Sequence, residues 1–286
     1  MSRNLVQRIA FAGIAIPLVV GLLWWGGWPL AAVLALLGVL GTREVYALAR
    51  RQQIDALDGI GLAAAAAIPI ATYWAKGSES HWAEPALFVG AMWLLAVLGL
   101  AMWTRGPRGR PLPAVAVTVF GALYASALPA FIIAIRHGGS AGVKSWPLAI
   151  LVLLPLALTW LCDTAAMAAG RLIGGPKLAP VLSPNKTWAG AIGGFAAAVL
   201  GALAAGRWVL PETGLQLGTL QLVAVGAAVG VVGQVGDVAE SLLKREAGVK
   251  DSSALIPGHG GVLDRLDSLY FVIPVGAGLF RLFGVI

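Results

Sequence analysis

Long apolar stretches recur along the whole chain, and they constrain its fold more than any other feature. Hydrophobic residues make up 59% of the 286 residues and charged residues 12%, whereas soluble domains carry about 25% charged residues. A helix crosses a hydrocarbon layer of about 30 Å with about 20 mostly apolar residues. Apolar windows lie near residues 9–26, 28–42, 59–75, 86–103, 114–135, 146–168, 188–206, 217–239 and 268–286. We therefore predict an all-α polytopic membrane protein with about nine transmembrane helices, or eight if the short second window is re-entrant.

Lys and Arg are distributed unevenly between the alternate loops of this predicted topology. Most of the 20 basic residues lie in the N-terminus and in the loops after the second, fourth, sixth and eighth windows. Loops rich in Lys and Arg face the cytoplasm. We therefore predict that the N-terminus and segment 237–267 are cytoplasmic and that the C-terminus lies outside.

The chain shows no internal repeat, so we interpret residues 1–286 as a single membrane domain. Residues 1–145 carry few polar groups outside their loops, and we expect scaffold spans or dimer contacts there. Residues 146–286 are expected to hold the catalytic spans and cytoplasmic loops. The net charge of +7 is spread over loop ends, which favours anionic lipid headgroups over nucleic acid as the counterpart.

Ionisable side chains return inside the predicted eighth helix. Asp237, Glu240, Ser241 and Lys244 follow one another at helical spacing and share one helix face. One interpretation is a polar stripe in which Asp237 pairs with Lys244. Acids within a membrane span are costly and usually functional, however, and two acids with a single Lys leave an excess of negative charge. A bound cation would neutralise that excess.

The segment that follows mixes basic, acidic and glycine residues. Glycines beside His259 allow backbone N–H groups to approach a phosphate, and Lys and Arg side chains neutralise its charge. The alternative for His259 is a turn histidine with a satisfied hydrogen bond. The candidate residues of this segment are Arg245, Lys250, Asp251, His259, Gly260, Gly261, Asp264, Arg265 and Asp267.

A second polar segment lies between the sixth and seventh windows. Its glycines and prolines predict an irregular loop, and Lys186-Thr187 is expected to open the next helix, whose N-terminus attracts anions. The alternative is a simple capping turn with a lysine that only marks topology. The candidate residues of this segment are Asp163, Arg171, Ser183, Asn185 and Lys186.

Together the two segments combine acids suited to Mg²⁺ with basic groups suited to several phosphates. This combination indicates metal-assisted phosphoryl or nucleotidyl transfer. A hydrolytic triad is not supported, because no Ser has a recognisable His partner. A cation- or proton-coupled transporter would place its acids near the bilayer midplane, in symmetric pairs. A CDP-alcohol phosphotransferase would require a DG…AR…G…D…D pattern, which the sequence lacks.

The run from Ser241 to Asp267 resembles the signature of the phosphatidate cytidylyltransferases, also called CDP-diacylglycerol synthases. It contains Lys244-Arg245, Lys250-Asp251, His259-Gly260-Gly261 and Asp264-Arg265-Leu266-Asp267. Segment 163–188 resembles that family's upstream conserved block. The resemblance implies the reaction of CTP with phosphatidate to give CDP-diacylglycerol and pyrophosphate, the committed step of phospholipid synthesis. It also implies Mg²⁺, with K⁺ as a second ion, and a homodimer in the bacterial cytoplasmic (inner) membrane whose active site faces the cytoplasm.

The following roles are hypotheses that combine the residue chemistry with this resemblance. We expect Asp237 and Asp264 to be the principal metal ligands, and His259 to contact phosphate and not to act as a base. The expected metal ligands are Asp237, Asp264, Glu240, Asp267 and Asp163. The expected catalytic residues are Asp237, Asp264, Lys244, Arg245 and His259. The expected substrate-binding residues are Lys186, Arg171, Ser183, Asn185, Lys250, Asp251, Gly260, Gly261, Arg265 and Ser241.

Overall fold

The computed structural model describes residues 3–75, 83–138, 145–256, 258 and 260–286, and most of these are helical. The helices are α1 (Arg3–Trp25), α2 (Gly27–Arg51), α3 (Asp58–Trp74), α4 (Ala83–Thr104), α5 (Pro111–Ala122), α6 (Leu128–His137), α7 (Ser145–Leu172), α8 (Trp188–Trp208), α9 (Leu210–Thr213), α10 (Thr219–Glu246), α11 (Leu263–Leu266) and α12 (Leu269–Leu282). A 3₁₀ turn, η1 (Pro107–Gly109), precedes α5, and a π-helical turn, η2 (Leu123–Ala127), joins α5 to α6. The two strands are β1 (Lys177–Ala179) and β2 (Ser183–Thr187).

Within the described residues, six helical stretches are long and apolar enough to cross a membrane. They are Gly27–Arg51, Pro85–Thr104, Pro111–His137, Trp146–Leu172, Trp188–Trp208 and Thr219–Glu246. The second predicted window lies in the first of these, a continuous helix of 25 residues, so the short re-entrant segment considered above is not observed. Helices also occupy the first, third and ninth windows, but α3 and α12, with 17 and 14 residues, are shorter than a full span.

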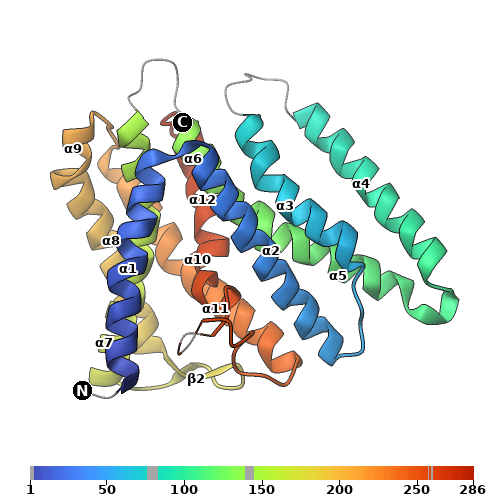
Figure 1. The fold of residues 1–286 in the computed structure, drawn as a ribbon. Coiled ribbons are helices and arrows are strands. Elements are labelled where there is room, and N and C mark those ends of the chain that lie inside the picture. The colour runs from blue at the N-terminus through green and yellow to red at the C-terminus, as the bar shows by residue number, and fades with distance from the viewer. Residues whose placement is uncertain (1–2, 76–82, 139–144, 257, 259) are drawn as a thin grey trace.

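The long helices run back and forth between two ends of the molecule (Figure 1). The start of α1, the β1–β2 hairpin, the last turn of α10 and α11 lie at one end, and the C-terminus lies at the other. The polar segments that the sequence analysis selected are therefore gathered at a single end of the helical body.

Small residues bring α7, α8 and α10 close together around the site. A Cβ atom on Gly190 of α8 would lie 2.7 Å from the Ala166 carbonyl oxygen of α7, and one on Gly226 of α10 would lie 2.6 Å from Val199 Cα of α8. Contacts this short tolerate only glycine. Close backbone approach through small residues is how helices associate where water supplies no driving force. The glycines of this half thus place the three helices that carry its polar residues side by side.

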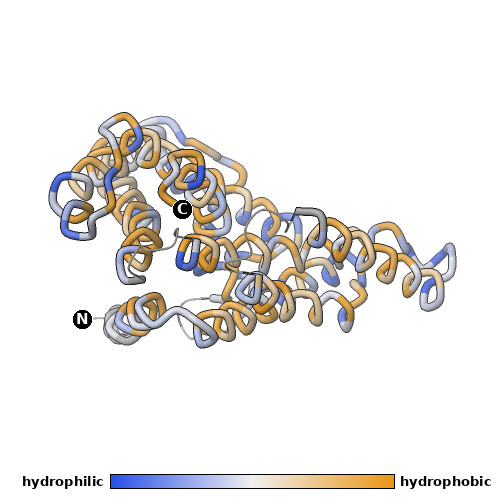
Figure 2. The backbone as a smooth tube through the Cα atoms, turned by 90° about the horizontal axis from the view of Figure 1, so that it is seen from above, coloured by the Kyte–Doolittle hydropathy of each residue, from blue (hydrophilic) through white to orange (hydrophobic). Residues whose placement is uncertain are grey.

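The N-terminal half is built differently. Helices α2, α3 and α5 pack together and bury Tyr46, whose hydroxyl donates a 2.8 Å hydrogen bond to the Thr118 carbonyl oxygen. Helix α4 packs mainly on α5 and exposes apolar side chains such as Leu87 and Met102 along most of its length. Seen from above, the chain extends as a narrow arm on this side, and apolar colouring dominates its helices (Figure 2). Such a face suits contact with lipid.

One correction concerns the loop between α7 and α8. The sequence analysis predicted an irregular segment in an all-α protein, yet β1 and β2 form a short antiparallel hairpin with Lys177 opposite Thr187 and Ala179 opposite Ser183. Gly174 and Gly175 adopt positive φ angles of 69° and 94° just before it. They turn the chain sharply after α7 and allow the strands to pair. The glycines therefore start a hairpin and do not prevent one.

Candidate active site

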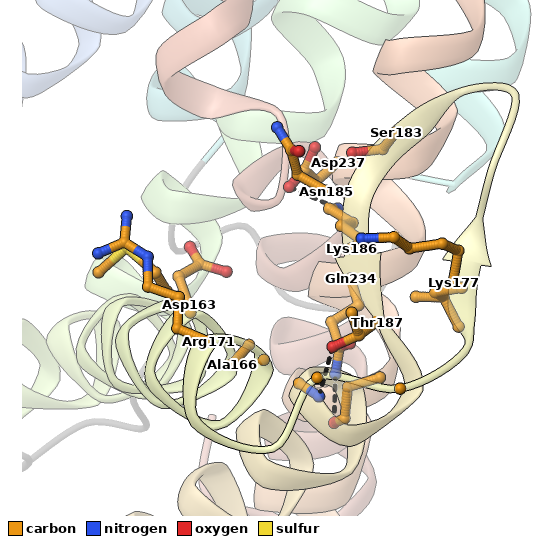
Figure 3. Close-up of a pocket in the computed structure, with 17 residues that line it drawn as sticks. Asp163, Ala166, Arg171, Lys177, Ser183, Asn185, Lys186, Thr187, Gln234 and Asp237 are labelled. Atoms are coloured by element: carbon orange, nitrogen blue, oxygen red, sulfur yellow. Dashed lines mark hydrogen bonds and ion pairs between the residues drawn. The ribbon is translucent and has the colours of Figure 1, made fainter.

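A polar cavity of about 870 Å³ opens beside the β1–β2 hairpin. Helix α7 contributes Asp163 and Arg171, the hairpin contributes Lys177 and Lys186, and α10 contributes Asp237 (Figure 3). Ser183 and Asn185 also line it. All five candidate residues of the segment between the sixth and seventh windows therefore share one cavity with Asp237. A common function was predicted for the two polar segments, and at this cavity one segment meets Asp237, the one described candidate residue of the other that lines it.

Lys186 and Asp237 form an ion pair across the cavity, with 2.6 Å between Nζ and Oδ2. The two side chains are 24% and 32% exposed. Asp237 therefore does not pair with Lys244, which was the structural alternative for this helix face. Solvent and ligands can reach the pair. Either side chain can therefore leave its partner and bind a charged group of a ligand instead, at a low cost in free energy.

Thr187 determines where the hairpin ends and α8 begins. Its backbone is extended and its hydroxyl accepts a 3.1 Å hydrogen bond from the Gly190 N–H, which is the geometry of a helix N-cap. This start of α8 confirms the expected helix opening after Lys186. It places Lys186 immediately before a helix N-terminus, where partial positive charge favours anions.

Gln234 is a cavity residue that the sequence analysis did not select. Its side-chain amide on α10 donates to the carbonyl oxygens of Ala191 (3.1 Å) and Gly230 (2.6 Å). It therefore ties α10 to α8 at the base of the cavity. The available signal was its position one helical turn before Asp237 on the same face.

An apolar groove of about 590 Å³ adjoins the polar cavity. The two share Leu178, Ala191 and Gln234 in their linings. The remaining groove residues come from the hairpin, α8 and α10, and they are almost all hydrophobic: Ala179, Leu182, Trp188, Ile192, Phe195, Val231, Val235, Val238, Ala239 and Leu242. A charged compartment thus leads directly into an apolar one, an arrangement that suits an amphiphilic ligand.

A second ionic cluster lies deeper in the protein. Lys244 Nζ lies 2.9 Å from Glu240 Oε1 and 2.6 Å from Asp264 Oδ1. The side chains of Lys244, Glu240 and Asp264 are only 12%, 0% and 5% exposed. One buried cation therefore holds two carboxylates, one from its own helix and one from α11.

Asp264 accepts further hydrogen bonds from the loop that precedes α11. Its Oδ2 accepts from the Ser252 and Gly261 N–H groups and from the Ser252 hydroxyl, each at 2.8 Å. Burial raises the pKa of Asp264, but these hydrogen bonds and the one from Lys244 outweigh it and bring the pKa below its usual value. Oδ2 is therefore fully engaged, while among the described residues Lys244 alone donates to Oδ1, which has a second lone pair.

Asp267 is within electrostatic reach of both the Lys186–Asp237 pair and the buried cluster of Lys244, Glu240 and Asp264. Burial, followed by the negative charges of Asp237 and Asp163, raises its pKa to about 6, against the opposing N–H of Ser268 and the charge of Lys244. These three carboxylates are thus within electrostatic reach of one another. Their oxygens are the ligands that Mg²⁺ prefers. Across the described part of the chain, however, no three His, Cys, Asp or Glu side chains are close enough to hold an ion as they stand.

The other predicted residues differ in their surroundings. Arg245 donates to the carbonyl oxygens of Leu182 (3.4 Å) and Val249 (3.0 Å), so it links the end of α10 to the hairpin turn. Gly261 directs its N–H to Asp264 and not toward an open site. Lys250, Asp251 and Arg265 are exposed, and Ser241 and Gly260 are partly buried. His259 lies outside the described residues.

Glu44 on α2 is the second residue that the sequence analysis missed. It is 6% exposed and accepts hydrogen bonds from the loop before α11. The second apolar window ends at residue 42, which predicted a loop from residue 43 onward, but α2 continues to Arg51. The continued helical spacing, with Glu44 between the buried residues Gly41 and Leu48, was the available signal.

Comparisons with known proteins agree with this arrangement. A family model described as the cytidylyltransferase family matches residues 6–283. A phosphatidate cytidylyltransferase from Brucella suis is 42% identical over 191 residues, which span 67% of this chain and 62% of that relative. A protein of the same name from Synechocystis sp. is 32% identical over 94% of both chains. Another from Pseudomonas aeruginosa is 44% identical over 48% of this chain and 50% of that relative. The match thus spans less than two thirds of the Brucella protein and nearly all of the Synechocystis protein.

Proposed function

Because this chain belongs to the cytidylyltransferase family, we propose that it is a phosphatidate cytidylyltransferase. It would join CTP to phosphatidate, forming CDP-diacylglycerol and releasing pyrophosphate. The names of its relatives and the resemblance of residues 241–267 to the family signature support this proposal.

The observation that carries the proposal is the continuity of the polar cavity with the apolar groove. Phosphatidate is an amphiphile with a phosphate monoester headgroup and two acyl chains. In the proposed complex, an acyl chain lies in the groove beside Trp188 and Phe195, and the headgroup enters the cavity toward Lys186. Leu178, Ala191 and Gln234 form the boundary between the two compartments.

The reaction needs little acid–base chemistry from the protein. The second pKa of a phosphate monoester lies near 6, so at neutral pH the attacking phosphate oxygen of phosphatidate is largely ionised. It forms a P–O bond to the α-phosphorus of CTP, the bond from that phosphorus to the β-phosphate bridging oxygen breaks, and pyrophosphate leaves. Positioning and charge neutralisation then supply most of the catalysis. Arg171, Lys177 and Lys186 face the cavity from two sides and suit that role.

We also propose that Mg²⁺ is required, with K⁺ as a second ion. The residues expected to hold the ions are Asp237, Asp163, Asp267, Glu240 and the second Oδ1 lone pair of Asp264. A divalent ion bound there would neutralise charge that develops on the phosphates. The donor chemistry fits such an ion, and binding requires these side chains to draw together, with Asp237 exchanging Lys186 for the ion.

We propose nine passes through the bacterial inner membrane, with the hairpin end of the molecule facing the cytoplasm. The alternating helix directions and the excess of Lys and Arg at that end support this topology (Figure 1). Single cysteines at Gly106 and Gly214, introduced with Cys162 replaced by Ser, should react with a membrane-impermeant maleimide from opposite sides. Labelling of both from the same side would contradict it. The homodimer is a further prediction, and the mass of the purified protein in nanodiscs would test it.

The direct test is turnover by purified protein in mixed micelles of phosphatidate and detergent. Labelled CTP should enter the lipid fraction in step with pyrophosphate release, and chelation of Mg²⁺ should abolish both. Diacylglycerol, which lacks the phosphate nucleophile, should not replace phosphatidate. Lys186→Ala should impair turnover, and Arg207→Ala, an exposed cation at the far end of α8, should not. Absence of lipid-dependent pyrophosphate release from folded protein would refute the proposal.

A further inference from the structure

Glu44 connects the N-terminal half of the molecule to the loop that carries Asp264. Its Oε1 accepts hydrogen bonds from the Val262 N–H at 3.0 Å and the Ser253 hydroxyl at 2.7 Å. Its Oε2 accepts from the Leu263 N–H at 2.9 Å and lies 2.9 Å from the Ser252 hydroxyl. A carboxylate has about four lone-pair sites. Three of them accept from Ser253, Val262 and Leu263, and the fourth faces the Ser252 hydroxyl, whose one hydrogen Asp264 can also accept.

Ser252 extends this contact to the buried ionic cluster. Its hydroxyl lies within hydrogen-bond distance of both Glu44 Oε2 and Asp264 Oδ2, and it donates to one of them at a time. Asp264 in turn accepts from Lys244, which is paired with Glu240 on α10. A continuous polar chain therefore runs from α2 through the loop to α10.

The geometry around Glu44 admits few replacements. Gly261 lies against the carboxylate, and a Cβ atom there would approach Glu44 Oε2 and Oε1 to within 2.4 and 2.5 Å. Glutamine would direct its NH₂ group at the N–H of Val262 or Leu263, which leaves that N–H unsatisfied. Aspartate is one methylene shorter and cannot reach the loop from the same helix position.

We propose that Glu44 is a positioning residue for the transfer reaction. It holds residues 252–253 and 262–263 against α2 and thereby fixes Asp264 and, through the ion pair, Lys244. Glu44 does not line the polar cavity, so it acts through these residues and does not touch the substrate. This inference rests on the proposed function for its kinetic consequence, whereas the loop-holding contact itself does not.

The kinetic test compares Glu44→Gln with wild type and with Glu246→Gln, an exposed acid at the end of α10. Misplacement of a reacting group by about 1 Å costs about 100-fold in rate, so kcat should fall by about that factor in Glu44→Gln. The KM for CTP should stay within about threefold, because the residues of the cavity are unchanged. Glu44→Asp should not restore kcat, and Glu246→Gln should resemble wild type. A folded Glu44→Gln protein with wild-type kcat would overturn the inference.

Hydrogen exchange gives a readout that does not depend on activity. Peptides covering Val262 and Leu263 should exchange faster in Glu44→Gln, while peptides from α8 keep their wild-type rates. Unchanged exchange at 262–263 would overturn the inference even if the wild-type enzyme were active. If wild type lacks transferase activity but Glu44→Gln still loosens this loop, the proposed function fails and the positioning contact stands.

A milder variant covers the case in which Glu44→Gln does not fold. Ser252→Ala removes the hydroxyl between the two carboxylates and leaves the Ser252 N–H on Asp264. It should lower kcat by about 10-fold, the cost of one lost hydrogen bond of about 1.4 kcal/mol, with the KM for CTP unchanged. Wild-type kcat in Ser252→Ala would overturn the inference.

Discussion

The two ionic groups of this protein use the same residue types in opposite surroundings. Lys186 and Asp237 meet at the wall of a cavity, where they keep 24% and 32% of their side-chain exposure. Lys244 joins Glu240 and Asp264 in the interior, where the three side chains keep 12%, 0% and 5%. The exposed pair can exchange partners for a ligand at low cost. The buried group cannot, because separating its charges leaves at least one of them without water or a partner.

This difference separates two roles that one sequence motif seemed to combine. The candidate residues from Asp237 to Asp267 are close together in the chain, yet of those that the structure describes only Asp237 lines the polar cavity. Lys244 and Asp264 bind each other and the loop that precedes α11. We infer that the exposed pair contacts the substrates, and that the buried group maintains the geometry of the site and adds carboxylate oxygens to the proposed ion site while it stays paired with Lys244.

The largest expected effect comes from removing the buried cation. Lys244→Ala removes the cation that Glu240 and Asp264 share in the interior, and loss of one member of a buried ion pair costs about 3–5 kcal/mol of stability. Lys186→Ala should instead leave stability nearly unchanged and raise the KM for phosphatidate by about 10-fold, as expected for loss of a contact of about 1.4 kcal/mol. Thermal unfolding in detergent and steady-state kinetics measure the two effects. Equal unfolding temperatures for both variants would contradict the difference in stability between the exposed pair and the buried group.

The next largest effect is expected on turnover. Asp237→Asn keeps the size of the side chain but removes the charge that is proposed to bind Mg²⁺. Loss of a residue that only supports a metal ligand costs about 10–100-fold, so loss of this proposed ligand should lower Mg²⁺-dependent turnover by at least about 100-fold. The unfolding temperature should change little, since Asp237 is partly exposed. Turnover near the wild-type rate would show that Asp237 is not a metal ligand.

A smaller effect tests how tightly the loop around the buried group is packed. In Gly261→Ala, the new Cβ would lie 2.2 Å from Ser252 Oγ and within 2.5 Å of Glu44 Oε1. Overpacking of this kind costs about 1–3 kcal/mol. Gly278→Ala on α12 is the matched control, because no atom lies within 4 Å of its Cβ position. Chemical denaturation should separate the two variants, and equal stability would mean that the loop relaxes without strain.

The smallest effect concerns pH. With its pKa raised to about 6, Asp267 binds a proton at a higher pH in the folded protein than in the unfolded chain. Its contribution to stability is therefore present below about pH 4 and is lost as pH rises through about 6.

Mg²⁺ binding should show the opposite trend, because the ion requires the carboxylate. The Mg²⁺ concentration for half-maximal activity should be about fourfold higher at pH 5.5 than at pH 7.5. Asp267→Asn should abolish this change, and an unaltered pH dependence in that variant would exclude Asp267 as its source.

Much of the fold was predictable because the relevant signals are local. Apolar windows predicted the six helices that are long enough to span a membrane, and the resemblance of residues 241–267 predicted the family. The hairpin was missed because strand pairing between Lys177 and Thr187 depends on two positive φ angles that Gly alone does not specify. Glu44 was missed because its partners lie more than 200 residues away in the chain.

By itself, the sequence determined that this is a helical membrane protein with acids and phosphate-binding residue types in two segments. Hydropathy and residue chemistry are properties of single residues and short windows, so they can be obtained from sequence alone. The tertiary structure decided which charges meet: Lys186 with Asp237 at the cavity, and Lys244 with Asp264 in the interior. Ion pairing depends on distance and on exclusion of water, and both are set only when α7, α8, α10 and α11 pack together.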